Sequence, residues 1–181
     1  MLVLENRHIG KVQATRGQSV YLLPGQLYFG NRAAQVKTLL GSCVALTLWH
    51  PHKRYGGMCH YLLPERHRPA DGSRDGRFGD EALEQLVDAI ERSGTRPADY
   101  EAQVYGGADT MKGEGKLRFN VGERNVEKAW ALVEQYGFSL TSIDVGGEEP
   151  RTITLEMVSG VVQLKRGGTH LPAGGQAGGM R

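Results

Sequence analysis

The sequence lacks any long apolar run, since no stretch approaches the roughly eighteen uninterrupted apolar residues that a membrane span needs. Its first residues, MLVLENRHIGKV, are interrupted by Glu5, Asn6 and Arg7 before an apolar segment of signal-peptide length develops. A large excess of charge of one sign is also lacking, because the formal net charge is only +2 at pH 7. These absences predict a soluble, cytoplasmic protein with no membrane insertion and no nucleic-acid partner.

Cysteine is scarce, with two residues among 181. In a reducing compartment this number excludes a disulfide scaffold, so each thiol has to be interpreted separately. The chain also has no paired-cysteine motif with zinc-ligand spacing. A metal site built from Cys43, Cys59 and His60 is therefore not expected.

Glycine is abundant, with 26 residues, many of them in pairs. Glycine pairs favour turns between short strands, which predicts a mixed fold with a sheet core and few long helices. The chain length is close to the usual size of one domain. We predict a single domain over residues 1–166, followed by a disordered Gly-rich tail over residues 167–181.

The apolar patterns predict an α+β protein. Strands are expected at residues 20–24, 35–40, 44–50, 58–63, 101–105, 139–143, 152–158 and 161–166, the last two forming a tight hairpin. One helix is expected from an N-cap at Asp80 to Gly94, and a second from about Arg124 to near Gly137. Strands at both ends and helices between them favour antiparallel or mixed sheet layers with the helices on one side.

One stretch, TLLGSCVALTLWHPHKRYGGMCHYLLP at residues 38–64, brings a cysteine and a histidine onto neighbouring strands of a predicted hairpin. If His60 lies opposite Cys43 or opposite Ala45, the thiol and the imidazole share one face of the sheet, whereas a shift of one residue separates them. Cys59 is adjacent to His60 in the same strand, and adjacent side chains point to opposite faces of a sheet. It is therefore expected to face away from His60 as a small buried apolar residue.

A thiol beside an imidazole has the composition of an activated nucleophile. The imidazole would take the thiol proton, leaving a Cys43 thiolate and a His60 imidazolium. Gly41 and Ser42, directly before the cysteine, would bring main-chain N–H groups to the position of an oxyanion. The alternative, a buried structural cysteine at the start of a strand, is left open by these residues.

Several motifs extend along the chain in one recognisable order. They are LGSCVAL, GMCHYLLP, YGGADTM at residues 105–111, NVGERNVE at 120–127 and DVGGEEPRTI at 144–153. In order and spacing they resemble the CheD family of chemoreceptor glutamine deamidases, and the resemblance covers residues 21–166. It implies an α/β/β sandwich similar to the catalytic domain of the cytotoxic necrotising factor toxins. The implied activity is hydrolysis of receptor glutamine side chains to glutamate, with no cofactor.

The resemblance also implies roles for individual residues. The family's nucleophilic cysteine falls on Cys43 and its histidine on His60. Its third residue, a threonine, commonly lies six residues before the cysteine, where this chain has Lys37. Thr38 lies one residue later and would face the other side of a regular strand. Thr38 is the candidate for the third catalytic residue, reaching His60 through a bulge in its strand, and a main-chain carbonyl that orients His60 is the alternative.

Methyl-accepting chemotaxis receptors are the protein substrates that the resemblance implies. A non-catalytic role as partner and regulator of a CheC-type chemotaxis phosphatase is the alternative, and a cysteine peptidase is a third possibility. The segment at residues 66–79 is predicted to be mobile. Its Arg-rich part, residues 66–77, is a candidate contact for acidic receptor helices, with a solvated loop as the alternative. The pairs Gly106-Gly107 and Gly146-Gly147 are expected to form ordinary turns.

Overall fold

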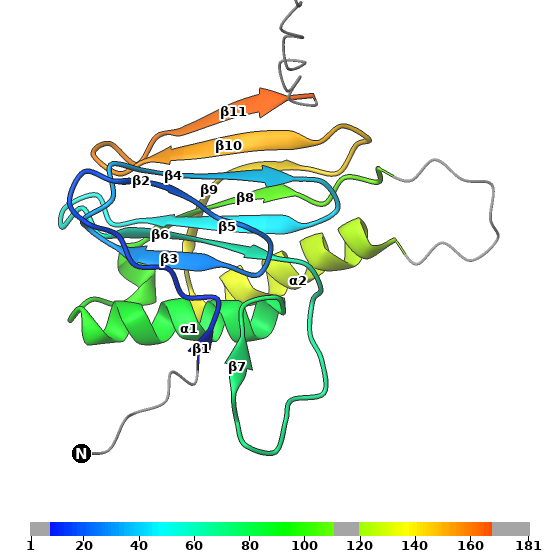
Figure 1. Ribbon diagram of the computed structural model, residues 1–181, viewed down its shortest axis with the longest axis horizontal. Helices are drawn as coiled ribbons and strands as arrows, with labels where there is room; N and C mark the ends of the chain where they lie inside the picture. The colour runs from blue at the N-terminus through cyan, green and yellow to red at the C-terminus, as the bar shows by residue number, and fades with distance from the viewer. Residues whose placement is uncertain (1–7, 111–119, 168–181) are drawn as a thin grey trace, which may run out of the picture.

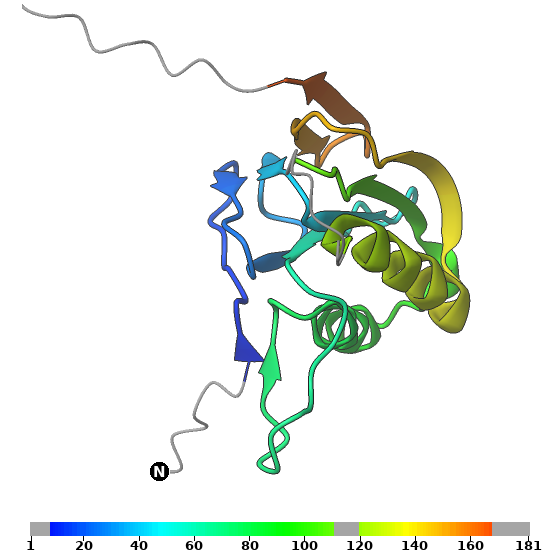
Figure 2. The ribbon, with the colours of Figure 1, turned by 90° about the vertical axis from the view of Figure 1, so that its right-hand side faces the viewer.

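The computed structural model describes residues 8–110 and 120–167. Two sheets stack on each other, and two α-helices cover the outer face of the larger sheet (Figure 1). The view turned by 90° shows the same three layers, with both helices on one side (Figure 2). The prediction of an α+β fold with α/β/β layers is confirmed.

The larger sheet has the strand order β3-β6-β5-β8-β9. Its strands are Leu27–Gly30 (β3), Gly56–Tyr61 (β6), Val44–Trp49 (β5), Glu101–Gly106 (β8) and Ser139–Val145 (β9). The smaller sheet has the order β11-β10-β4-β2, made by Val162–Arg166, Arg151–Glu156, Gln35–Leu40 and Ser19–Tyr21. Both sheets are mixed, because β8 pairs with β9 and β2 with β4 in parallel, whereas the other pairs are antiparallel.

The central strands β5 and β6 are buried at every position because they are covered on both faces. One apolar cluster, including Leu46, Cys59 and Leu86, lies between the larger sheet and the helices. A second cluster, including Ala45 and Met58, lies between the two sheets. Alternate residues of the same hairpin therefore enter two different cores.

The helices begin differently from the prediction. Helix α1 spans Gly79–Arg92 and its N-cap is Phe78, so the predicted cap at Asp80 is wrong. The first N–H groups of α1 donate instead to the carbonyls of Leu63 and Pro64, in the segment that follows β6. Helix α2 spans Val121–Tyr136, three residues longer at its start than predicted, because the Asn120 side chain caps it.

The ends of the helices agree better with the sequence. Gly137 is left-handed directly after α2, as its position after an apolar stripe predicts. Gly94 also has a positive φ, two residues beyond the end of α1. A short 3₁₀ turn, Pro97–Asp99, leads from there into β8.

Three short strands have no recognisable pattern in the sequence. They are His8–Ile9 (β1), β3 and Arg74–Asp75 (β7), of which β1 and β7 pair in parallel as a separate two-stranded sheet. Two-residue strands have no periodicity to detect, and β3 carries a glycine and only three apolar residues.

The Arg-rich segment is folded against α1, which contradicts the predicted mobility. Arg66 makes two hydrogen bonds to the buried Glu81 carboxylate, at 2.8 and 3.0 Å. Arg68 pairs with Glu84 and Arg74 with Asp88. Between positions 65 and 92 eight carboxylates outnumber five arginines. The arginines are thus neutralised within the chain, which removes the basis for electrostatic steering of an acidic partner.

No helix in the described residues is long and apolar enough to cross a membrane. Apart from Gly167, the tail predicted to be disordered lies outside the residues that the structure describes.

Replacing the two glutamates on α1 tests how this segment is held. Glu81→Gln removes a fully buried carboxylate that also accepts from the Asp75 N–H at 2.7 Å. We expect it to lower the free energy of unfolding by about 2 kcal/mol, because hydrogen bonds to buried charges are the costly ones to lose. The matched change Glu84→Gln, in a solvent-accessible pair, should cost less than about 1 kcal/mol. Equal midpoints and slopes for both variants in urea unfolding would contradict this account.

Candidate active site

The register of the central hairpin fixes how Cys43 and His60 relate. Ala45 on β5 lies directly opposite His60 on β6. Cys43 is two residues before Ala45, so it shares its face and lies diagonal to His60. Consistently, the half-buried Cys43 packs against the cluster between the two sheets. Of the two registers that put thiol and imidazole on one face, the structure has the one with His60 opposite Ala45.

Cys59 occupies the opposite face, as predicted. It pairs with Leu46 and belongs to the cluster beneath the helices, with no exposed surface. Burial raises the pKa of its thiol to about 12, so this sulfur is protonated and inert at neutral pH. Because it faces the helices, Cys59 cannot share a site with Cys43 and His60.

Thr38 is brought to His60 from the other sheet. Along β4 the inward residues are Val36, Thr38 and Leu40, whereas Lys37 is exposed. The Thr38 hydroxyl lies 2.7 Å from His60 Nδ1. The expectation that Thr38 would face away without a bulge is wrong, because β4 pairs regularly with β10 and its alternation places Thr38 inward.

The hydrogen bonds of Thr38 determine the tautomer of His60. The hydroxyl has one proton, and it donates that proton to the Leu22 carbonyl at 2.8 Å. His60 Nδ1 must therefore carry a proton and donate to Thr38 Oγ1. The lone pair then lies on Nε2, which is buried and has no hydrogen-bond partner among the described residues. Nε2 is thus the nitrogen that can accept a proton.

The surroundings keep both side chains neutral. Burial lowers the pKa of the His60 imidazole from 6.5 to about 4. Burial also raises the pKa of the Cys43 thiol, an effect that the main-chain amide of Cys43 partly opposes. At neutral pH Cys43 is therefore a thiol and His60 a neutral imidazole whose Nε2 makes no hydrogen bond to the sulfur, in contrast to the thiolate and imidazolium expected from the sequence.

Three consecutive carbonyls hold the loop that carries Cys43. The Gly41 carbonyl accepts from Ala108 N at 3.0 Å and the Cys43 carbonyl from Gly107 N at 2.8 Å. Between them, the Ser42 carbonyl accepts from Asn125 Nδ2 at 3.1 Å. Asn125 lies on α2 within the NVGERNVE motif, and the sequence alone gave it no role.

The glycines that matter for this loop lie at the end of β8. Gly106 has φ +110°, and a methyl group there would overlap the Cys43 carbonyl oxygen. A methyl group on Gly107 would overlap Val126 and the Gly122 carbonyl of α2. Gly41, by contrast, has room for a methyl group at 3.6 Å from Thr110 Cγ2. Close packing at the end of β8, not a turn at Gly41, therefore demands glycine.

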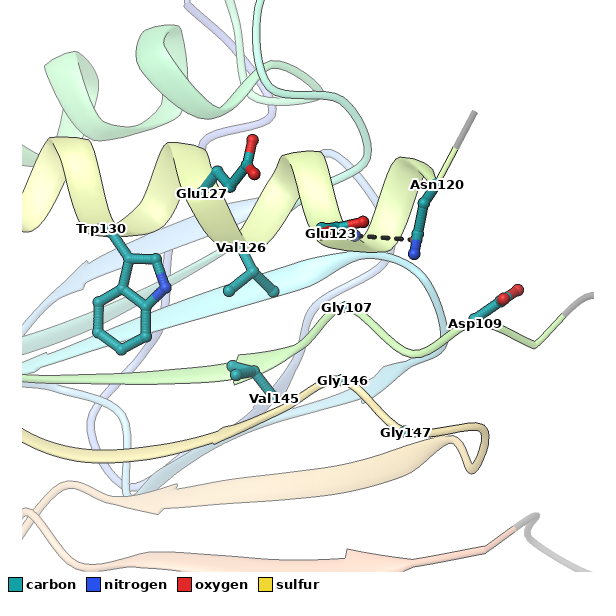
Figure 3. Close-up of a pocket in the computed structure, with 10 residues that line it drawn as sticks. All are labelled: Gly107, Asp109, Asn120, Glu123, Val126, Glu127, Trp130, Val145, Gly146 and Gly147. Atoms are coloured by element: carbon teal, nitrogen blue, oxygen red, sulfur yellow. Dashed lines mark hydrogen bonds between the residues drawn. The ribbon is translucent and has the colours of Figure 1, made fainter. Parts of the chain in front are cut away.

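A cavity of about 440 Å³ lies beside this loop, between α2 and the ends of β8 and β9 (Figure 3). Val126 and Trp130 of α2 face Val145 across it. Gly107, Gly146 and Gly147 also line it, so three of the four paired glycines shape a cavity as well as turn the chain. Neither Cys43 nor His60 lines it, and Gly107 connects it to the loop through its hydrogen bond to Cys43.

A buried guanidinium supports the same glycines. Arg151 is 1% exposed and donates to the carbonyls of Gly106 and Gly146. Its charge is balanced by an ion pair with Asp144 at 3.2 Å. Burial lowers the pKa of Arg151, although an arginine stays charged after such a shift. The sequence signal for this residue was its place in the DVGGEEPRTI motif.

The fold and the site define an α/β/β sandwich with a cysteine, a histidine and a threonine on the facing surfaces of its two sheets. The family model described as CheD chemotactic sensory transduction matches residues 62–166. The chain belongs to the CheD family.

Named relatives extend the similarity beyond that range. The chain is 43% identical over 145 residues to the probable chemoreceptor glutamine deamidase CheD 3 of Dechloromonas aromatica, covering 80% of this chain and 85% of that protein. It is 41% identical over 151 residues to the probable chemoreceptor glutamine deamidase CheD 1 of Chromobacterium violaceum, covering 83% and 78%. Among solved structures, a Bacillus licheniformis hypothetical protein, YfiH, aligns with a TM-score of 0.44 and 12% identity over 76% of this chain and 63% of that chain.

The buried imidazole predicts a pH dependence of stability. Unfolded His60 binds a proton below about pH 6.5, whereas folded His60 stays neutral down to about pH 4. The unfolded state therefore gains protons first as the pH falls, and the stabilisation present above pH 6.5 is lost by pH 4. The loss should be roughly 1.4 kcal/mol per pH unit, or roughly 3 kcal/mol in all.

The difference in unfolding free energy between wild type and His60→Gln, measured by urea denaturation at several pH values, isolates this group from the carboxylates. As the pH falls from 6.5 to 4, the unfolding free energy of wild type should decrease relative to that of His60→Gln. Parallel pH curves for the two proteins would show that His60 is not buried as a neutral ring.

Proposed function

We propose that this protein hydrolyses the side-chain amides of specific glutamines on methyl-accepting chemoreceptors, producing glutamate and ammonia. The observation that carries this proposal is the hydrogen bond from His60 Nδ1 to Thr38, which leaves Nε2 free as a base on the face that Cys43 shares. Membership of a family whose named relatives are probable chemoreceptor glutamine deamidases supplies the substrate class. We assign the activity to residues 1–166 and to the cytoplasm.

In the first half of the reaction Cys43 is the nucleophile and His60 the base. As Sγ attacks the carboxamide carbon, the thiol proton moves to His60 Nε2, the C–S bond forms and the carbonyl π electrons move to oxygen. Main-chain N–H groups of Ser42 and Cys43 stabilise the oxyanion. The oxyanion then collapses, the C–N bond breaks, and the imidazolium gives its proton to the departing nitrogen. The products are ammonia and a thioester on Cys43.

In the second half a water molecule replaces ammonia. Neutral His60 takes a proton from the water as its oxygen attacks the thioester carbon. The C–S bond breaks and the sulfur recovers its proton from His60. Glutamate is released, and the resting pair of neutral thiol and neutral imidazole is restored. Thr38 keeps the ring in one tautomer through both halves.

The two cysteines provide a matched test of the nucleophile. Cys43→Ala should abolish ammonia release from a chemoreceptor cytoplasmic fragment, because no other thiol reaches His60. Cys59→Ser should retain turnover, because Cys59 lies under the helices on the opposite face. Peptide mass mapping of the receptor fragment locates each converted glutamine and would reveal cleavage fragments if the enzyme were a peptidase. Retained conversion by Cys43→Ala, with melting curves like wild type, would end the proposed mechanism.

Thr38 offers a test of the tautomer. Thr38→Val removes the acceptor for Nδ1–H while keeping the shape of the side chain, so the basic nitrogen is no longer fixed at Nε2. We expect kcat to fall by about 10- to 100-fold, a part of what a well-placed general base contributes. Thr38→Ser keeps the hydroxyl and should restore most of the activity. A Thr38→Val enzyme with wild-type kcat would mean that packing alone orients His60.

A further inference from the structure

Asn125 connects the third layer of the fold to the loop of the nucleophile. It lies on α2 and has no exposed surface. Its Nδ2 donates to the Ser42 carbonyl at 3.1 Å and to the Leu62 carbonyl at 2.8 Å. The main-chain carbonyl of Asn125 accepts from the Tyr61 hydroxyl. One side chain thus ties the residue before Cys43 to the second residue after His60.

The orientation of the Asn125 amide follows from its partners. Both carbonyls only accept hydrogen bonds, so the NH₂ group has to face them. The amide oxygen, Oδ1, is then left buried without a hydrogen-bond partner among the described residues. An unsatisfied buried acceptor costs stability. The Asn125 side chain thus donates to the carbonyls of Ser42 and Leu62, while its own amide oxygen accepts no hydrogen bond from the described residues.

The bond to Ser42 fixes the direction of the next N–H group. A trans peptide is planar, and its C=O and N–H point in opposite directions. Because the Ser42 carbonyl points to Asn125 on α2, the Cys43 N–H points away from the helix layer. No carbonyl in the described part of the chain accepts from the N–H of Ser42 or Cys43. Apart from its effect on the sulfur of the same residue, the Cys43 N–H is thus oriented and bonded to no main-chain carbonyl of the described residues, as an oxyanion donor must be.

We propose that Asn125 is a positioning residue that presents the Cys43 N–H to the tetrahedral oxyanion. It acts through the Ser42–Cys43 peptide and does not itself contact the substrate. Ala108 and Gly107 hold the flanking carbonyls of the loop, so Asn125 controls the one peptide plane between them. This inference rests on the proposed amidase function and adds a residue to its machinery.

The test compares two reactions of the same thiol. Deamidation of the receptor fragment passes through an oxyanion, whereas alkylation of Cys43 by iodoacetamide does not. In Asn125→Leu and in Asn125→Asp, which keeps the volume but loses the two donors, we expect kcat to fall by about 10- to 1,000-fold with KM little changed. The alkylation rate, followed by mass mapping of the Cys43 peptide, should change by less than about threefold, because alkylation forms no oxyanion and burial, not the Cys43 N–H, has the larger effect on the thiol pKa.

Thr95→Val is the matched control for loss of a buried hydrogen bond. The Thr95 hydroxyl bonds to the Tyr100 hydroxyl at 2.8 Å, before the start of β8, whereas the nucleophile loop contacts the residues that follow its end. This variant should melt earlier than wild type and keep its kcat. All variants are assayed at a temperature where their melting curves show them folded, and Asn125→Asp serves if Asn125→Leu does not fold.

Wild-type kcat in a folded Asn125 variant would overturn the inference. Parallel losses of deamidation and alkylation would also overturn it, because they would mean that the thiol itself had moved. A similar loss of kcat in Thr95→Val would assign the effect to stability. Absence of turnover by the wild-type protein would instead refute the proposed function.

Discussion

The hydrogen bond between Thr38 and His60 crosses from the smaller sheet to the larger one, and the orientation and tautomer of His60 depend on it. It is buried, so water does not compete for either group, and the Leu22 carbonyl takes the only hydroxyl proton. Thr38 Oγ1 can then only accept from His60 Nδ1–H, so Nε2 is the basic nitrogen of the ring. The stacking of two sheets at this point thus converts a core histidine into a base of fixed orientation.

Burial has opposite effects on the pKa values of Cys43 and His60. It lowers the pKa of His60 and raises that of Cys43, so both rest in their neutral forms. Two neutral side chains avoid the cost of two buried charges. In the proposed mechanism, main-chain donors around Cys43 then stabilise the charge that develops on oxygen. The orientation of these donors depends on three successive carbonyls, which residues of α2 and the end of β8 hold in place.

Much of the framework follows from local patterns in the sequence. Strand β4 was predicted with its observed bounds, and β5 within one residue, because apolar residues and flanking glycine and proline mark them clearly. The orientation of Cys59 toward the helix side follows from the alternation of side chains along a strand, since its neighbour His60 faces the other sheet. Segment 66–79 was misjudged because its composition is that of a solvated loop, while its arginines find carboxylates on a helix that follows in sequence. Strands β1 and β7 are too short to carry a period.

The sequence by itself determined which residue types were present for the chemistry, and the resemblance carried by its motifs selected Cys43 and His60. It could not place Thr38, because inward or outward orientation on β4 depends on its register with β10 and β2, and those strands are far apart in the chain. The role proposed for Asn125 is not predictable from the sequence, because an asparagine inside a helix has no local signature of function. Only the tertiary structure brings α2 against the loop before β5, since that contact joins segments 83 residues apart and depends on glycines that let their backbones approach.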